Sequence, residues 1–284
     1  MNGYSMKAKS RWFAIFLLLP LAASAQTADE IVNKAVAARG GAEKIKAIQS
    51  ERVTGRVTFG PGLEGSLVAE LKRPHKLRVE IMVEDQRIIR VYDGKSAGWV
   101  VNPFAEKKDA QPMSAEDLKS VSEESDFDGP FIDYKAKGNQ IELVGKEDLQ
   151  GKSAYRIKLT GKNGNTRFYL FDATSFLPVK WEETRVVEGK EMPWESFFSD
   201  YREVNGVKYA FKIDSDSPGT DLKQSVVAEK IEINAQIDDD HFAKPVVPEA
   251  QPAAPSAKQD LIEDSRSAAA ASRLFIASAS GKPA

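Results

Sequence analysis

"RFYLFDATSFLPVKWEE", residues 167–183, is the stretch that decides the predicted fold. It reads as two short strands around a tight corner, because the side chains of residues 172–175 can hydrogen-bond to nearby backbone. Pro178 lies early in the second arm, where a missing N–H does least harm. The stretch therefore predicts a β-hairpin that buries aromatic side chains on one face, and it shows no evident nucleophile, base or metal ligand.

The same alternation of apolar and polar residues continues on both sides of this hairpin. KLRVEIMVE (76–84), AYRIKLTG (154–161), VNGVKYAFKID (204–214) and AEKIEINAQID (228–238) all alternate with a period of two. About ten such segments are joined mostly by short polar turns. They predict an antiparallel up-and-down sheet rather than βαβ units.

Helical patterns interrupt the strands in two places. Thr27 and Glu30 form a capping box before IVNKAVAAR, and a second short helix is predicted over 42–48. MSAEDLKSVSEESDF (113–127) predicts a third helix with Ser114 at its N-cap. Because a sheet of this length must curl, we predict a mainly β (α+β) fold, an incomplete β-barrel with helices covering the concave face.

The two ends of the chain differ from the middle. Residues 1–25 read as a secretory signal peptide, with a basic start, an apolar run too short to span a bilayer and the motif Ala23-Ser24-Ala25 before the predicted cleavage. Residues 245–284 are rich in Ala, Pro and Ser and predict a flexible tail, with a transient helix around 259–276. The predicted domain is therefore 26–244.

Composition excludes several classes of protein. The sequence has no cysteine, so disulfides and Cys-based metal sites are excluded, and no other segment is expected to be long enough to cross a membrane. With 42 acidic against 40 basic side chains, it lacks the basic excess that nucleic-acid binding requires.

No catalytic constellation can be named. His75 reads as a turn residue, and His241 follows Asp238–Asp240, a cluster that we interpret as a polar strand end rather than a metal site. The carboxylates between 123 and 128 read as a loop charge run rather than a glycosidase pair. We predict a protein that is not an enzyme and that uses no metal or cofactor.

Apolar and aromatic side chains on the alternating strands are the candidates for a ligand-binding site. Such residues line pockets and barrel mouths, but they also fill ordinary cores, and periodicity cannot separate the two. The candidates are Leu77, Val79, Ile81, Val83, Trp99, Tyr155, Ile157, Leu159, Phe168, Leu170, Val179, Trp181, Tyr209 and Phe211.

Several segments resemble the LolA-like family of outer-membrane lipoprotein-sorting proteins. They are VYDGKSAGWVVNP (91–103), DFDGPFIDYKAKGNQIELVGKE (126–147), YLFDATSFLPVKWE (169–182), SDYREVNGVKYAFKI (199–213) and EKIEINAQIDDDHF (229–242). The resemblance implies an incomplete β-barrel closed off by helices around a hydrophobic cavity. It also implies a functional arginine on an early strand, for which Arg52 and Arg56 are both candidates.

The resemblance implies a function as well. The chain is expected to be a carrier in the periplasm of a diderm bacterium that binds acyl chains of lipoproteins, or lipid, and works with an inner-membrane exporter and an outer-membrane receptor. The predicted tail is a difference from the family, whose classical carriers are shorter and lack a Pro/Ala-rich extension of this kind. The alternative is a non-catalytic interaction or sensing module of the cell envelope on the same fold.

Overall fold

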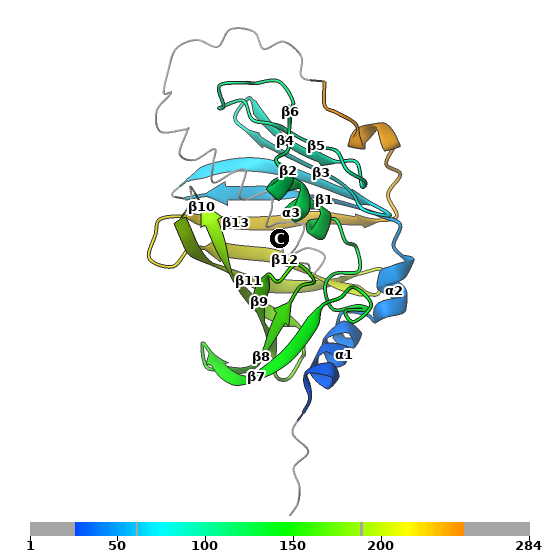
Figure 1. The fold of residues 1–284 in the computed structure, drawn as a ribbon, viewed down its shortest axis with the longest axis vertical. Helices are drawn as coiled ribbons and strands as arrows, with labels where there is room; N and C mark the ends of the chain where they lie inside the picture. Colours follow the sequence, from blue (N-terminus) through cyan, green and yellow to red (C-terminus); the bar gives the residue numbers. More distant parts are fainter. Residues whose placement is uncertain (1–25, 61, 188–189, 247–284) are drawn as a thin grey trace, which may run out of the picture.

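The protein is described by a computed structural model covering residues 26–60, 62–187 and 190–246, in which the strands form one antiparallel sheet (Figure 1). The strands are β1 (Ser50–Phe59), β2 (Leu63–Lys72), β3 (Lys76–Val83), β4 (Gln86–Tyr92), β5 (Gly98–Val101), β6 (Gln111–Pro112), β7 (Gln140–Leu149), β8 (Lys152–Thr160), β9 (Thr166–Asp172), β10 (Pro178–Val187), β11 (Lys190–Val204), β12 (Val207–Asp216) and β13 (Lys223–Ile233). The helices are α1 (Ala28–Ala38), α2 (Ala42–Ala47), α3 (Ala115–Glu124) and the 3-10 helix η1 (Asp239–Phe242).

The first and last strands of the chain lie next to each other in the middle of the sheet. The strand order is β6-β5-β4-β3-β2-β1-β13-β12-β11-β10-β9-β8-β7, so β1 pairs with β13 and the two edges are β6 and β7. Every other connection joins neighbouring strands. The segment from β6 to β7 must therefore pass from one edge of the sheet to the other, and α3 lies on that path.

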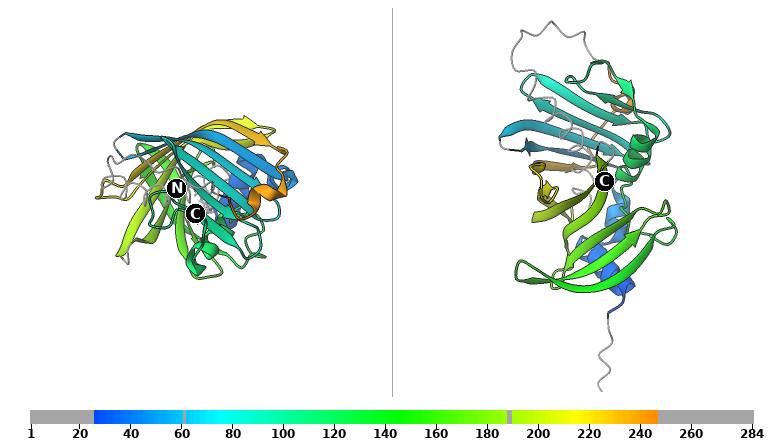
Figure 2. Two further views of the ribbon diagram at one scale, coloured as in Figure 1. Left: turned by 90° about the horizontal axis from the view of Figure 1, so that it is seen from above. Right: turned by 60° about the vertical axis from the view of Figure 1, so that its left-hand side comes forward.

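The sheet curves without closing, as Figure 2 shows from two sides. The prediction of an incomplete antiparallel barrel with covering helices is confirmed. Bulges between Thr54 and Gly55, Leu143 and Gly145, and Pro178 and Lys180 shift the register and add local bending. At Gly55 the strands approach closely, because a Cβ there would lie 2.2 Å from the carbonyl oxygen of Val227.

The helices begin where the sequence predicts. Thr27 and Glu30 make both hydrogen bonds of the capping box at the start of α1, and the Ser114 side chain accepts from the backbone N–H of Asp117 at the start of α3. Ile31 and Ala35 bury the apolar side of α1 against the sheet. Local capping thus defines where α1 and α3 begin, and one apolar stripe defines the covering face of α1.

The hairpin of residues 167–183 is confirmed as β9 and β10. The Asp172 carboxylate accepts hydrogen bonds from the backbone N–H groups of Thr174 (3.1 Å) and Ser175 (2.7 Å), which forms the corner. Pro178 is the first residue of β10. The bulge beyond it leaves Trp181 opposite Tyr169.

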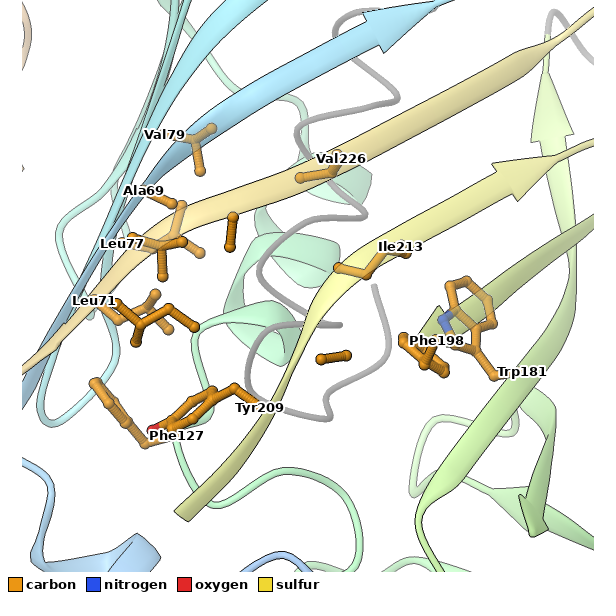
Figure 3. Packing of buried hydrophobic residues seen from close by; sticks show 14 of the residues in the cluster. Ala69, Leu71, Leu77, Val79, Phe127, Trp181, Phe198, Tyr209, Ile213 and Val226 are labelled. Carbon is orange, nitrogen blue, oxygen red and sulfur yellow. The ribbon is translucent and has the colours of Figure 1, made fainter. Parts of the chain in front are cut away.

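Two hydrophobic clusters lie on opposite faces of the sheet. The larger one fills the concave side, where residues of β2, β3, β10, β12 and β13 converge (Figure 3). The smaller one lies on the convex side of β4 and β5, under η1, and consists of Ile89, Val91, Val101, Ala110, Ile237 and Phe242. Phe242 of η1 is 2% exposed, so residues 237–242 belong to the folded unit.

Among the residues that the structure describes, no helix combines the length and apolar character needed to cross a bilayer. The predicted signal peptide lies outside the described residues, as does the predicted tail beyond Val246. The boundaries of the predicted domain therefore stay predictions.

Candidate ligand-binding face

Most of the apolar candidates come together on the concave face. They belong to the larger cluster and none is more than 7% exposed. These residues are Leu77, Val79, Ile81 and Val83 of β3, Tyr155, Ile157 and Leu159 of β8, Trp181 of β10, and Tyr209 and Phe211 of β12. They make the inner wall of the half-barrel; whether they contact a ligand stays a prediction.

Four candidates do not join this wall. Trp99 pairs with Val91 and packs on the convex cluster, because the inward residue of β5 is its neighbour Val100. Phe168 and Leu170 also lie on the outer side of β9. Since Ile157 pairs with Tyr169, the inward residues of β9 are Tyr169 and Phe171.

Val179 is the fourth of them. It falls at the bulge between Pro178 and Lys180, which reverses the alternation of β10 at that point. Its side chain borders an outward-open depression shared with Phe197 and Asp214. Val179 therefore does not join Trp181 on the inner wall, although both are candidates for the ligand-binding site.

Both candidate arginines lie on the outer face of β1. The Arg52 Nε lies 2.8 Å from Glu70 Oε1, and Arg52 also donates to the backbone carbonyl of Gln236. Arg56 is 65% exposed and pairs with Glu229 at 3.0 Å. Neither guanidinium faces the concave side.

Other arginines occupy the concave side instead. Arg90 of β4 pairs with Glu124 of α3 at 3.0 Å, and the two side chains are 3% and 0% exposed. Burial raises the pKa of Glu124, and the positive charge of Arg90 offsets only part of this rise. The pair fixes the end of α3 to the sheet.

A second charged group lies next to it, on β9 and β10. The Arg167 Nε donates to Glu183 Oε2 at 2.6 Å, and the Nε of Arg185 donates to the other oxygen of the same carboxylate. Burial alone would raise the pKa of Glu183, but Arg167 and Arg185 outweigh it and lower that pKa. Glu123 of α3 lies 3.7 Å from Arg167.

The guanidinium of Arg185 also lies over two indole rings. Its central carbon is 5.5 Å from the ring centre of Trp181 and 4.6 Å from that of Trp194. Both Nη atoms of Arg185 are buried without a hydrogen-bond partner, and the same holds for the indole N–H groups of Trp181 and Trp194 and the hydroxyl of Tyr169. The concave face therefore carries unused donors inside an apolar wall.

Sequence reasoning missed these polar residues because it sought apolar alternation. The signal was present in the strands: Ile88, Arg90 and Tyr92 alternate, and so do Trp181, Glu183 and Arg185. A charged residue at an otherwise inward position was the feature that could have marked them.

A small cavity lies between α1, the loop after α3 and β9. Its volume is about 20 Å³, and its walls include Ala35, Val36, Phe131, Tyr169 and Phe171. This is room for about one water molecule. An acyl chain would therefore enter at this place only if α1 or the loop moved.

The two histidines lie apart from this face. The Nδ1 of His241 is 2.8 Å from Glu70 Oε2 on the outer side of β2, and His75 lies in the turn before β3. Within the described residues, no group of three or more His, Asp or Glu is arranged to hold a metal ion.

Comparison with known proteins places the fold. No family model matches the sequence, and no curated protein matches it. A DUF1329 family protein from Desulfovibrio piger matches with a TM-score of 0.54 and 12% identity, over 76% of this chain and 97% of that one.

Two further solved structures are similar. A LolA superfamily protein from Nitrosomonas europaea matches with a TM-score of 0.51 and 16% identity, over 78% of this chain and 99% of its own. A putative outer membrane lipoprotein-sorting protein domain from Vibrio parahaemolyticus has a TM-score of 0.51 and 12% identity, over 76% and 96% of the two chains. The chain therefore has the fold of the LolA-like and DUF1329 proteins, and identities this low show the fold alone.

Proposed function

We propose that this protein binds the acyl chains of lipids or lipoproteins on its concave face and carries them through the periplasm toward the outer membrane. The observation behind the proposal is the apolar inner wall, which is built from strands of both halves of an unclosed sheet. An acyl chain in water exposes CH₂ groups at a cost of about 0.8 kcal/mol each, so transport through an aqueous compartment needs such a wall. The LolA-like fold of the chain supports this reading.

Binding in this proposal requires the covering segments to move. α1 and the loop after α3 leave a cavity of only about 20 Å³ beneath them. Their attachments at the surface are polar: the Tyr134 hydroxyl donates to Asp29 of α1 at 2.6 Å, and Lys135 pairs with the same carboxylate at 3.0 Å. Exposed contacts of this kind contribute little, so the main cost of opening lies in the buried contacts, such as those of Ile31 and Ala35 of α1 with the sheet.

Uptake of a neutral fluorescent probe, N-phenylnaphthylamine, tests the proposal. The wild-type full chain is expected to bind it with enhanced fluorescence. Val36→Trp fills the space between α1 and β9 and is expected to weaken binding by about tenfold or more, the effect of losing on the order of 1.4 kcal/mol. Val68→Trp on the outer face, where Val68 is 37% exposed, is the matched control and should bind as wild type does.

Two results would count against a carrier. One is the absence of probe binding by the wild-type chain; the other is equal binding by both tryptophan variants. Either would favour the non-catalytic interaction module. Gentle purification from a periplasmic extract followed by native mass spectrometry identifies the cargo, because a bound lipid or acylated peptide adds its own mass.

A further inference from the structure

The unpartnered donors of the concave face gather at one place. Tyr169 of β9 stands opposite Trp181 of β10, Glu183 of β10 stands opposite Trp194 of β11, and the Arg185 guanidinium covers both indoles. Figure 3 shows Trp181 beside Phe198, on the inner side of neighbouring strands. Three adjacent strands therefore supply one cluster.

Each unpartnered atom of this cluster can donate a hydrogen bond. The set consists of both Nη atoms of Arg185, the Nε1 atoms of Trp181 and Trp194 and the hydroxyl of Tyr169. A buried donor without a partner costs about 1–3 kcal/mol, and more when it is charged. Most buried polar groups in proteins are satisfied, so a cluster of unsatisfied donors marks a place where an acceptor binds.

Two of the three guanidinium nitrogens of Arg185 have no hydrogen-bond partner among the described residues. Its Nε bonds to Glu183, but that carboxylate is shared with Arg167, whose Nε lies 2.6 Å away. Burial lowers the pKa of Arg185, yet an arginine starts so far above neutrality that it stays protonated. An acceptor that carries negative charge therefore fits better here than a neutral one.

We propose that Arg185, with the indole N–H groups of Trp181 and Trp194 and the Tyr169 hydroxyl, binds the oxyanion head group of an acyl-chain amphiphile, a carboxylate or a phosphate. This inference rests on the proposed function, since the surrounding wall receives the chain. Phe198 and Ile213 lie beside the cluster and provide the apolar contact for the first carbons of the chain.

Binding of four dodecyl compounds to the full-length protein tests this site. They are dodecanoate, dodecyl phosphate, dodecanol and dodecyltrimethylammonium, and displacement of N-phenylnaphthylamine measures their dissociation constants. Wild-type protein is expected to bind dodecanoate or dodecyl phosphate at least about tenfold tighter than dodecanol and the cation. The tighter of the two oxyanions identifies the head group as a fatty acid or a phospholipid type.

Arg185→Met is expected to remove that preference, so that the oxyanions bind about as weakly as dodecanol does. Arg156→Met is the matched control. Arg156 also pairs with two carboxylates, Glu147 and Glu182, and lies 4.4 Å from an aromatic ring centre, that of Phe168, but on the outer face. It should keep the wild-type preference.

Thermal unfolding of the ligand-free protein, compared with dodecanol binding, separates a binding role from a structural one. Arg185→Met removes one of the two guanidiniums that pair with Glu183, so its Tm is expected to fall, but a binding role predicts that oxyanion binding falls while dodecanol binding is kept. A lower Tm with parallel loss of dodecanol and dodecanoate binding would assign Arg185 to structure and overturn the proposal.

The failures of the two proposals differ. Equal affinity of wild-type protein for dodecanol and both oxyanions would overturn the head-group site and leave the acyl-chain carrier standing. No binding of any dodecyl compound would overturn both.

Discussion

Arg90 of β4 and Glu124 of α3 form a buried ion pair across the open side of the half-barrel, with Nη1 and Oε2 3.0 Å apart. α3 lies on the one connection that runs between the two edges of the sheet. Ser120, one turn earlier in α3, also contacts the Glu124 carboxylate. This pair therefore determines where the crossing helix rests on the concave face.

Replacing one partner of the pair should lower the free energy of unfolding strongly, and replacing both should lower it little. Glu124→Leu leaves the Arg90 charge buried and is expected to lower the free energy of unfolding by about 3–5 kcal/mol. Arg90→Met combined with Glu124→Leu should recover most of this loss, since neither side chain of the pair then carries a charge. Urea unfolding measures both changes, and a single variant as stable as the double one would contradict the argument.

The cost of Arg90→Met should depend on pH. Burial already raises the pKa of Glu124 above its ordinary 4.5, and loss of Arg90 removes the charge that opposes this rise. A carboxyl whose pKa is raised in the folded state favours folding at low pH and loses that contribution as pH rises through the folded pKa. The destabilisation by Arg90→Met is therefore expected to grow from about pH 5 to about pH 8, and urea unfolding at several pH values measures it. A pH-independent cost would contradict it.

Asp239 of η1 should titrate at unusually low pH. Hydrogen bonds from Lys72 (2.8 Å) and Lys76 (2.9 Å) lower its pKa from 3.8 to about 2. Its contribution to the docking of η1 is present above the unfolded pKa and is lost as pH falls from about 4 toward 2. NMR titration of the carboxyl carbon gives the pKa directly, and Lys72→Met should raise it toward 3.8. An ordinary pKa in the wild-type chain would show that the lysines do not hold the carboxylate.

The sequence predicted the sheet and its lids because local rules govern them. Alternation placed the strands, the capping box of Thr27 and Glu30 began α1, and Asp172 formed the corner of the hairpin. Faces were predicted well on β3 and β8, where apolar and polar residues alternate cleanly.

Faces were predicted wrongly where both sides of a strand are apolar. In β9, Phe168 and Phe171 have opposite orientations, and only pairing with β8 decides which one is inward. The bulge at Val179 depends on how β9 and β10 meet, which no local pattern encodes. The donors around Arg185 were missed for a related reason. They form one cluster only because β9, β10 and β11 are adjacent in space, and the sequence does not show this adjacency.

Gly55 should not tolerate a side chain. A Cβ at this bulge would lie 2.2 Å from the Val227 carbonyl oxygen, which is backbone and cannot move aside freely. Gly55→Ala is expected to lower the free energy of unfolding by about 1–3 kcal/mol through overpacking. Gly161→Ala is the control, because its nearest atom is the side-chain oxygen of Asn163 at 3.0 Å. Equal stability of the two variants in urea would contradict the close approach.

Arg73 should hold together α2 and the loop after α3, which cover part of the concave face. Its Nε donates to the Ile48 carbonyl at the end of α2 (2.5 Å), its Nη2 lies 2.7 Å from Asp128 Oδ1, and its guanidinium lies 5.0 Å from the ring centre of Phe127. One side chain thus ties α2 to the loop that roofs the small cavity beside Phe131. Arg73→Met removes charge-assisted hydrogen bonds of about 1.5–3 kcal/mol each, so amide hydrogen exchange in residues 127–132 should accelerate by roughly tenfold or more.

The same variant links stability to the proposed function. If the loop must open for cargo to enter, Arg73→Met should bind N-phenylnaphthylamine faster than wild type in stopped-flow fluorescence. Arg202→Met is the control. Like Arg73, Arg202 pairs with one aspartate and lies close to an aromatic ring, 4.5 Å from the ring centre of Phe211. It differs in being 54% exposed and in pairing with Asp200, which is not part of the loop. Faster exchange in the loop without faster probe binding would mean that cargo enters past α1 instead.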